Sequence, residues 1–281
     1  MKSDFVMITK DDKKLPYALK GLSRNEKFIN RLILVDGSST NYAKTLAEKF
    51  LPKVEIVYIK DVHGNRATAR QKGINLVETP LFAFVDSDVE LPKNWYTKIT
   101  GFFKLKKIGA VWGCALPVNP VRRQYQLAMA RFYHKNPIQL TVQQGAIRGM
   151  LHDTMIRTTL VKDIRIPIQL HVMEDHYIRK HIESKGYLWI STDKAYCWHH
   201  QPDVTYNGAF LDAYYGWKLK VYPKKWYLKH ISLFWGKFAY LAISTRNRKL
   251  IKQELIKEKA FITAVLKAII EKQAKTSKTL R

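Results

Sequence analysis

The chain has 281 residues, and its 49 Lys and Arg outnumber its 23 Asp and Glu, which gives a formal net charge of +26. Because 46% of the residues are hydrophobic, the composition excludes a disordered polycation and predicts a sizeable core. Two cysteines are too few for a disulfide framework or a cysteine-rich zinc site, and the first residues lack the apolar core of a signal peptide, so we expect a cytoplasmic protein.

Short apolar runs alternate with helical patterns in the first part of the chain. The predicted strands are rich in β-branched or aromatic residues and cover residues 5–9, 32–35, 54–59, 81–85 and 110–113. The helices predicted between them cover residues 15–24, 41–50, 66–77 and 95–104. This alternation predicts an α/β fold with a mainly parallel sheet and helices on both faces. Ligands of such sheets bind beyond the carboxyl ends of the strands.

The second half of the chain changes in composition. Prolines interrupt any pattern over 114–170, after which an acidic start predicts a helix over 173–184 and a strand follows over 187–191. Residues 208–281 hold 17 basic and 4 acidic residues. This shift predicts a catalytic domain at 1–206 and a basic amphipathic helical extension at 207–281. The extension's longest apolar stretch is interrupted by two lysines and a histidine, so we predict no membrane-spanning helix.

The sharpest chemical signal is Asp86-Ser87-Asp88, directly after the apolar strand 81–85. Carboxylates at the carboxyl end of a central strand can hold a hard cation and its anionic ligand. The alternative is an ordinary turn, because Asp and Ser are common where strands end. A second strand ends in Asp36, which could accept hydrogen bonds from a ribose or a base. The glycine spacing fits neither a dinucleotide-binding fingerprint nor a P-loop.

Several segments, in their order along the chain, resemble family 2 glycosyltransferases of the GT-A fold. They are LILVDGSS at 32–39, GNRATARQKG at 64–73, FAFVDSD at 82–88, the pair Glu174-Asp175, and His199. The resemblance covers residues 5–205 and implies an inverting transferase that uses a nucleotide-sugar donor. The chain has no Gln-x-x-Arg-Trp sequence, which argues against a processive polysaccharide synthase.

The resemblance also implies a role for each matching residue. Asp36 would contact the base of the nucleotide, and Arg70 would lie near the base or ribose. Asp175 would deprotonate the acceptor hydroxyl, with Glu174 beside it. The implied donor-binding residues are Thr9, Asp36, Arg66, Arg70, Asp86 and Ser87, and the implied ligands of Mg²⁺ or Mn²⁺ are Asp86, Asp88 and His199.

The chemistry supplies reasons for these residue types. A nucleoside diphosphate leaves as an anion, so a cation with oxygen ligands suits the site, and a sugar hydroxyl needs a carboxylate base. From the residues alone, however, Glu174 and Asp175 fit an ordinary acidic first turn of a helix. His199 and the adjacent His200 are equally good candidates for a metal ligand from the residues alone, and the resemblance favours His199.

The C-terminal quarter has three interpretations. These are ordinary packing with a solvated charged face, nucleic-acid binding by interleaved basic and aromatic residues, and attachment to an anionic membrane. The third is favoured because aromatic, aliphatic and basic residues combine without a spanning length. We therefore predict transfer of one sugar to an acceptor hydroxyl or lipid phosphate, on a glycan or lipid-linked acceptor, by an enzyme peripheral to the inner face of the cell membrane. The competing hypothesis is a basic nucleic-acid-binding protein with a non-catalytic α/β domain.

Overall fold

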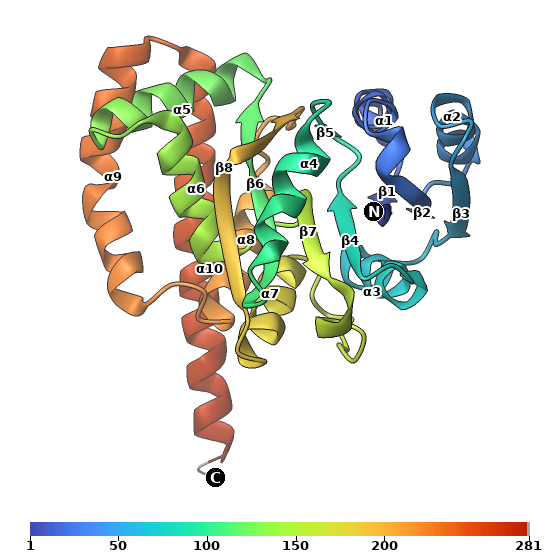
Figure 1. Cartoon of the computed structure of the whole chain (residues 1–281). Helices are drawn as coiled ribbons and strands as arrows, with labels where there is room; N and C mark the ends of the chain where they lie inside the picture. Colours follow the sequence, from blue (N-terminus) through green and yellow to red (C-terminus); the bar gives the residue numbers. More distant parts are fainter. Residues whose placement is uncertain (280–281) are drawn as a thin grey trace. The chain divides into compact units, whose positions relative to one another are not determined.

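A computed structural model describes residues 1–279 of the chain. These residues form two compact units (Figure 1). The first contains Met1–Val118 and Ile138–Gln201, and the second contains Asn119–Pro137 and the residues from Pro202 onwards. The second unit thus takes in the described part of the predicted 207–281 extension together with an earlier segment that the sequence did not assign to it. Leu280 and Arg281 lie outside the described residues.

The first unit is built on a mainly parallel sheet of eight strands. Their order is β3-β2-β1-β4-β7-β6-β8-β5. Within this order β7 runs antiparallel to both neighbours, and β5 is antiparallel to β8, whereas the other pairings are parallel. The strands are β1 Ser3–Thr9, β2 Ile29–Asp36, β3 Glu55–Lys60, β4 Leu81–Val85, β5 Val89–Glu90, β6 Ile108–Pro117, β7 Asp153–Arg157 and β8 Leu188–His199.

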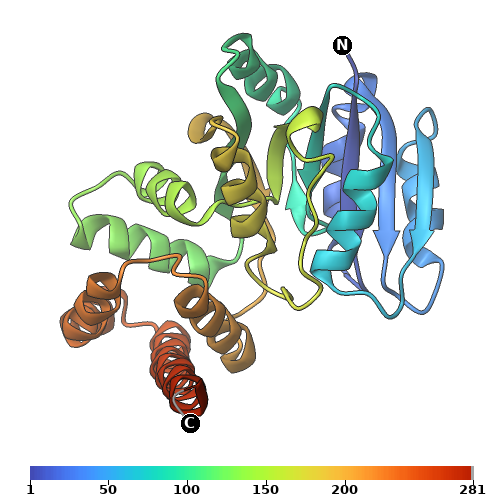
Figure 2. The same ribbon diagram turned by 90° about the horizontal axis from the view of Figure 1, so that it is seen from below.

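Helices cover both faces of this sheet (Figure 2). One apolar cluster joins the sheet to α1 (Leu15–Ser23), α2 (Tyr42–Phe50) and α4 (Trp95–Thr100). A second cluster on the opposite face joins it to α3 (Arg66–Leu76) and α7 (Glu174–Ser184). Because side chains alternate along a strand, each central strand contributes to both clusters. The strands are therefore nearly continuous apolar runs, as the sequence indicated. The first unit also contains α6 (Pro137–Arg148), except for its first residue, and the short 3₁₀ helices Glu26–Phe28, Gly101–Lys104 and Thr158–Leu160.

The register of the sheet gathers polar residues at one edge. Thr9 pairs with Asp36, so β1 and β2 end side by side. The last residue of β4, Val85, pairs with the first residue of β7, Asp153. Val89 then pairs with His199 at the end of β8. The turn that carries Asp86, Ser87 and Asp88 consequently lies between the ends of β4 and β8.

The second unit contains four helices, α5 (Pro120–Phe132), α8 (Tyr206–Lys218), α9 (Lys224–Thr245) and α10 (Arg248–Thr279). Gln124 on α5 donates to the Thr245 carbonyl over 3.1 Å. Phe132 packs on Tyr240 of α9 with ring centroids 5.2 Å apart. Among the described residues, no helix combines the length and apolar character needed to cross a membrane.

The α/β class predicted from the sequence is confirmed. The five strands predicted before residue 114 and the helices between them all occur, with ends shifted by a few residues. The helix predicted at 95–104 ends at Thr100 and continues as a 3₁₀ turn, and the strand predicted at 187–191 extends to His199. The structure adds α5, α6 and β7 within 114–170, where the sequence pattern gave no prediction.

The close approach of α1 to the chain before α4 generates a stability prediction. A Cβ atom added at Gly21 would lie 2.3 Å from the backbone nitrogen of Leu91, whereas one at Gly101 would meet nothing within 4 Å. We expect Gly21→Ala to lower the free energy of unfolding by about 1–3 kcal/mol, because backbone cannot move aside. The control Gly101→Ala should be neutral or stabilising by up to about 1 kcal/mol. Urea denaturation measures both, and equal effects would contradict the packing described.

Candidate active site

Asp36 lies at the end of β2 and is fully buried. Its Oδ1 accepts hydrogen bonds from the backbone and hydroxyl of Ser38 over 2.8 and 2.5 Å. Its Oδ2 accepts from the Tyr58 hydroxyl over 2.9 Å and lies 3.6 Å from the ammonium of Lys60. The carboxylate therefore fixes the turn after β2. Beside it, the buried hydroxyl of Thr9 has no hydrogen-bond partner among the described residues, which leaves a polar group for a ligand.

Arg70 connects two carboxylates that are far apart in the sequence. The Asn65 capping box starts α3, so that Arg70 lies one turn into the helix. Its Nε donates to Glu174 Oε1 and its terminal nitrogen donates to Asp86 Oδ1, each over 3.0 Å. Burial opposes the charge on Arg70, but the two carboxylates outweigh it and raise the pKa of the guanidinium. These ion pairs link the turn after β4 to the first turn of α7.

Asp88 and His199 form the second contact at this edge. Asp88 Oδ2 lies 3.2 Å from His199 Nε2. Burial would raise the pKa of Asp88, but the hydrogen bond and charge of His199 lower it to about 2. The side-chain amide of Gln201 lies 2.9 Å from His199 Nδ1 and orients the ring. His200 instead lies against Glu90.

Asp175 is a buried carboxylate at the start of α7. Met173, which precedes the helix, has a left-handed backbone with φ of 71°, and both acids follow in the first turn. Asp175 Oδ1 accepts from the backbone N–H of His176 over 2.8 Å, and its Oδ2 lies 3.3 Å from Nε of Arg148. Burial raises the pKa of Asp175 to about 6, although Arg148 opposes the shift. A carboxyl group with this pKa can accept a proton near neutral pH.

The remaining predicted residues divide into two groups. Ser87 is buried and donates to Asp12 Oδ2 over 2.6 Å, which ties the turn after β4 to the loop after β1. Arg66 is exposed at the first residue of α3 and takes no part in the contacts above.

The sequence analysis missed Asp12 and Arg148. Asp12 follows the first strand at the ligand-binding edge, which was a usable signal, whereas Arg148 lies in the unpredicted segment.

The donor types at this edge suit a divalent cation, but the ligand atoms of Asp86, Asp88 and His199 are not gathered within 4.8 Å of one another; among the described residues, those of His152, Asp153 and Cys197 are. Asp88 is partly exposed, is held ionised by its low pKa, and lies against an imidazole. Asp86 adds a carboxylate whose side chain is 30% exposed. Carboxylate oxygens with one imidazole suit Mg²⁺ or Mn²⁺.

The structure thus has a mainly parallel sheet with carboxylates at its carboxyl edge and a buried carboxyl group, Asp175, at the start of a neighbouring helix. The glycosyl transferase family 2 profile matches residues 4–164, more than half of the chain. The protein therefore belongs to family 2 of the glycosyltransferases, which confirms the resemblance noted in the sequence and the predicted enzyme class. No curated protein sequence matches the chain.

Solved structures share the GT-A fold at low sequence identity. Mannosyltransferase PcManGT from Pyrobaculum calidifontis, in complex with GDP-Man and Mn²⁺, has a TM-score of 0.65 at 14% identity and covers 97% of this chain and 88% of its own. S. aureus TarS 1–349 has a TM-score of 0.56 at 16% identity, with 94% and 90% covered. The match to S. aureus TarS spans 76% of this chain but only 39% of TarS, with a TM-score of 0.55 at 18% identity.

The raised pKa of Asp175 predicts a pH-dependent stability. Between 3.8, its ordinary value, and about 6, the folded protein binds more protons than the unfolded chain. The free energy of unfolding should therefore fall as pH rises through this window, by on the order of 3 kcal/mol. Asp175→Asn removes this titration, so we expect the variant to gain stability relative to wild type from pH 4 to pH 7. Denaturant titrations at each pH measure the difference.

The control is Glu183→Gln on the same helix. Salt bridges to Lys180 and Arg179 lower the pKa of Glu183 against the effect of burial. Its variant should lose stability relative to wild type as pH rises, which is the opposite sign. A difference between Asp175→Asn and wild type that stays constant from pH 4 to pH 7 would contradict the assigned shift.

Proposed function

We propose that the protein transfers one sugar from a nucleotide-sugar donor to an acceptor with inversion at the anomeric carbon, in a metal-dependent reaction. The observation that carries this proposal is the chain of contacts from Asp86 through Arg70 to Glu174, which links the turn after β4 to the first turn of α7, where Asp175 follows Glu174. Donor-side and acceptor-side groups would thereby share one site.

The donor would bind across the ends of β1, β2 and β4. The unpartnered buried hydroxyl of Thr9 and the fixed turn at Asp36 suit the nucleoside, as the resemblance implies. PcManGT with GDP-Man and S. aureus TarS 1–349 with UDP-GlcNAc are structural neighbours that bind nucleotide sugars.

Asp86, Asp88 and His199 would hold Mg²⁺ or Mn²⁺ together with the donor diphosphate. When bound, such a cation neutralises charge on the leaving nucleoside diphosphate. Gln201 can serve His199 in either tautomer, because its amide presents both a donor and an acceptor. Arg70 would keep Asp86 oriented toward the ligand.

Asp175 would act as the base that removes the proton of the acceptor hydroxyl. Its pKa of about 6 keeps it largely ionised at neutral pH while leaving it basic enough to accept a proton. A lipid phosphate would need no such base because it is already ionised, so the presence of Asp175 favours a hydroxyl between the two proposed acceptor groups. Attack from the face opposite the leaving diphosphate inverts the anomeric carbon.

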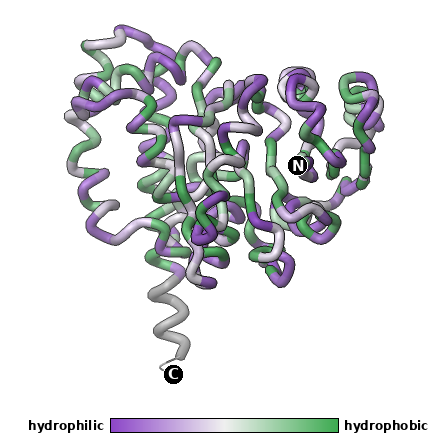
Figure 3. The backbone as a smooth tube through the Cα atoms, viewed as in Figure 1, coloured by the Kyte–Doolittle hydropathy of each residue, from purple (hydrophilic) through white to green (hydrophobic). Residues whose placement is uncertain are grey.

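The helices of the second unit would attach the enzyme to the cytoplasmic face of the membrane. Along α9, Leu228 and Trp235 are 71% and 69% exposed and recur at helical spacing with Ile231. Figure 3 shows hydrophobic and hydrophilic residues alternating along this helix. α10 adds Leu255, Ile262 and Leu266, also exposed, among numerous lysines. Exposed apolar residues flanked by lysine are typical of helices that lie on anionic bilayers.

Turnover of Asp175→Asn tests the assigned base. We expect kcat to fall about 100-fold or more with little change in donor affinity, because the amide keeps the shape but cannot accept a proton. The wild-type rate should rise with pH through an apparent pKa near 6, and this limb should disappear in the variant. Glu174→Gln serves as the comparison, since Glu174 pairs with Arg70 and should affect donor affinity. A pure loss of kcat in Glu174→Gln would reverse the two roles.

Flotation with phosphatidylglycerol and phosphatidylcholine vesicles tests membrane attachment. Each Lys or Arg near an anionic surface contributes about 1 kcal/mol, and the apolar residues add binding that salt does not screen. We expect wild type to float partly even at high salt and the double variant Leu228→Ser with Trp235→Ser to lose the salt-resistant fraction. Leu105→Ser, a 65% exposed leucine of the first unit, is the matched control. Failure to float at any salt concentration, with tight RNA binding, would favour nucleic acid as the partner.

A further inference from the structure

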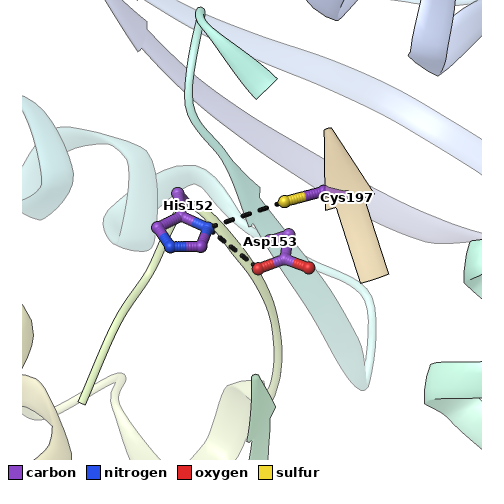
Figure 4. Close-up of side chains that lie close together, drawn as sticks. All are labelled: His152, Asp153 and Cys197. Carbon is purple, nitrogen blue, oxygen red and sulfur yellow. Dashed lines mark hydrogen bonds and ion pairs between the residues drawn. The ribbon is translucent and has the colours of Figure 1, made fainter. Parts of the chain in front are cut away.

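Figure 4 shows a group of polar side chains that lie close together. It consists of His152, Asp153 at the start of β7, and Cys197 on β8, all of them buried. His152 Nδ1 lies 2.9 Å from Asp153 Oδ1 and 3.9 Å from the sulfur of Cys197. The sequence analysis did not single out any of the three.

Asp153 is the centre of this group and is surrounded by donors. The indole N–H of Trp95 reaches its Oδ2 over 3.4 Å, and the thiol of Cys197 also hydrogen-bonds to it. A Cβ atom at Gly113 would lie 2.2 Å from Oδ2, so only glycine leaves room for this carboxylate. Oδ1, by contrast, has no hydrogen-bond partner among the described residues, and the atom that approaches it is Nδ1 of His152.

The contact with Asp153 fixes the ring of His152. The indole N–H of Trp112 also lies 3.4 Å from Nδ1, but the carboxylate is nearer at 2.9 Å. Nδ1 is thus held between the indole N–H of Trp112, which it accepts, and the carboxylate of Asp153. Contacts of this kind at one ring nitrogen orient an imidazole.

His152 in turn contacts two of the proposed metal ligands. Its backbone carbonyl accepts the N–H of Asp86 over 3.0 Å. Its ring packs against the ring of His199 with centroids 4.8 Å apart and an interplanar angle of 45°. One residue thus supports both the turn that carries the first carboxylate and the imidazole at the other end of the donor set.

We propose that His152, oriented by the buried Asp153, is a positioning residue that holds Asp86 and His199 in the arrangement a divalent cation requires. The inference rests on the proposed metal-dependent function of the same site. It predicts that the charge of Asp153, although remote from the cation, determines metal affinity. Groups that orient metal ligands typically change metal affinity by about 10–100-fold when they are removed.

The competing explanation is that the group itself binds a metal. A thiolate, an imidazole and a carboxylate within 4.8 Å of one another are a ligand set that Zn²⁺ accepts. Such binding would release the thiol proton of Cys197 when the ion binds. The cysteine gives this alternative a distinct spectroscopic signature.

The test is direct Mn²⁺ binding, followed by the electron paramagnetic resonance signal of free Mn²⁺, together with the Mn²⁺ concentration that gives half-maximal turnover. We expect both values to rise about 10-fold or more in Asp153→Asn, with kcat at saturating Mn²⁺ much less affected. His152→Gln keeps the backbone contact to Asp86 but lacks the ring, and serves if Asp153→Asn does not fold. Cys197→Ser, which keeps a donor to Asp153, is the matched control and should leave Mn²⁺ binding unchanged.

The outcomes separate this inference from the proposed function. If wild type neither binds nor requires Mn²⁺ or Mg²⁺, the metal-dependent function fails and the positioning role fails with it. If wild type requires the ion but folded Asp153→Asn and His152→Gln bind Mn²⁺ as tightly as wild type, only the positioning role is overturned. A thiolate-to-metal charge-transfer band with Co²⁺ that disappears in Cys197→Ser would also overturn it, by showing that the buried group is itself a metal site.

Discussion

The active site depends on two ion pairs of the buried Arg70. Its guanidinium is a charge inside the protein, and it pairs with the carboxylates of Asp86 and Glu174. Breaking a buried pair by removing one partner is typically destabilising by about 3–5 kcal/mol, because it leaves an uncompensated charge. The end of β4, the second turn of α3 and the first turn of α7 are therefore held in register by electrostatics rather than by apolar contact alone.

Two carboxylates of this site have pKa values shifted in opposite directions. Asp88 has a pKa of about 2 because His199 outweighs the effect of burial, whereas burial raises the pKa of Asp175 to about 6 even though Arg148 opposes it. One residue therefore stays anionic under all ordinary conditions, and the other can exchange a proton. Such separation is how identical side chains take different roles in one site.

The sequence predicted the elements whose burial shows as a local pattern of apolar residues. The apolar run before Asp86, for example, is a central strand that is buried on both faces. The partners of the site residues were not predictable, because Arg70 and Glu174 are 104 positions apart and meet only through the sheet topology. The left-handed backbone at Met173 carries no glycine or asparagine signal, although it sets the direction of both acids. Asp153 begins a strand that the sequence pattern did not reveal, and His152 directly precedes it.

The second unit is assembled from two separate stretches of chain. Gln124 of α5 hydrogen-bonds to Thr245 at the end of α9 and to Asn247 just before α10, yet α5 is synthesised before both helices. During translation Phe132 of α5, which packs on Tyr240 of α9 in the finished fold, lacks this partner until α9 emerges. No single cut can release either unit intact, and a chain that ends after β8 would expose α5. The C-terminal helices α9 and α10 are thus needed to cover α5, in addition to any surface that they bind.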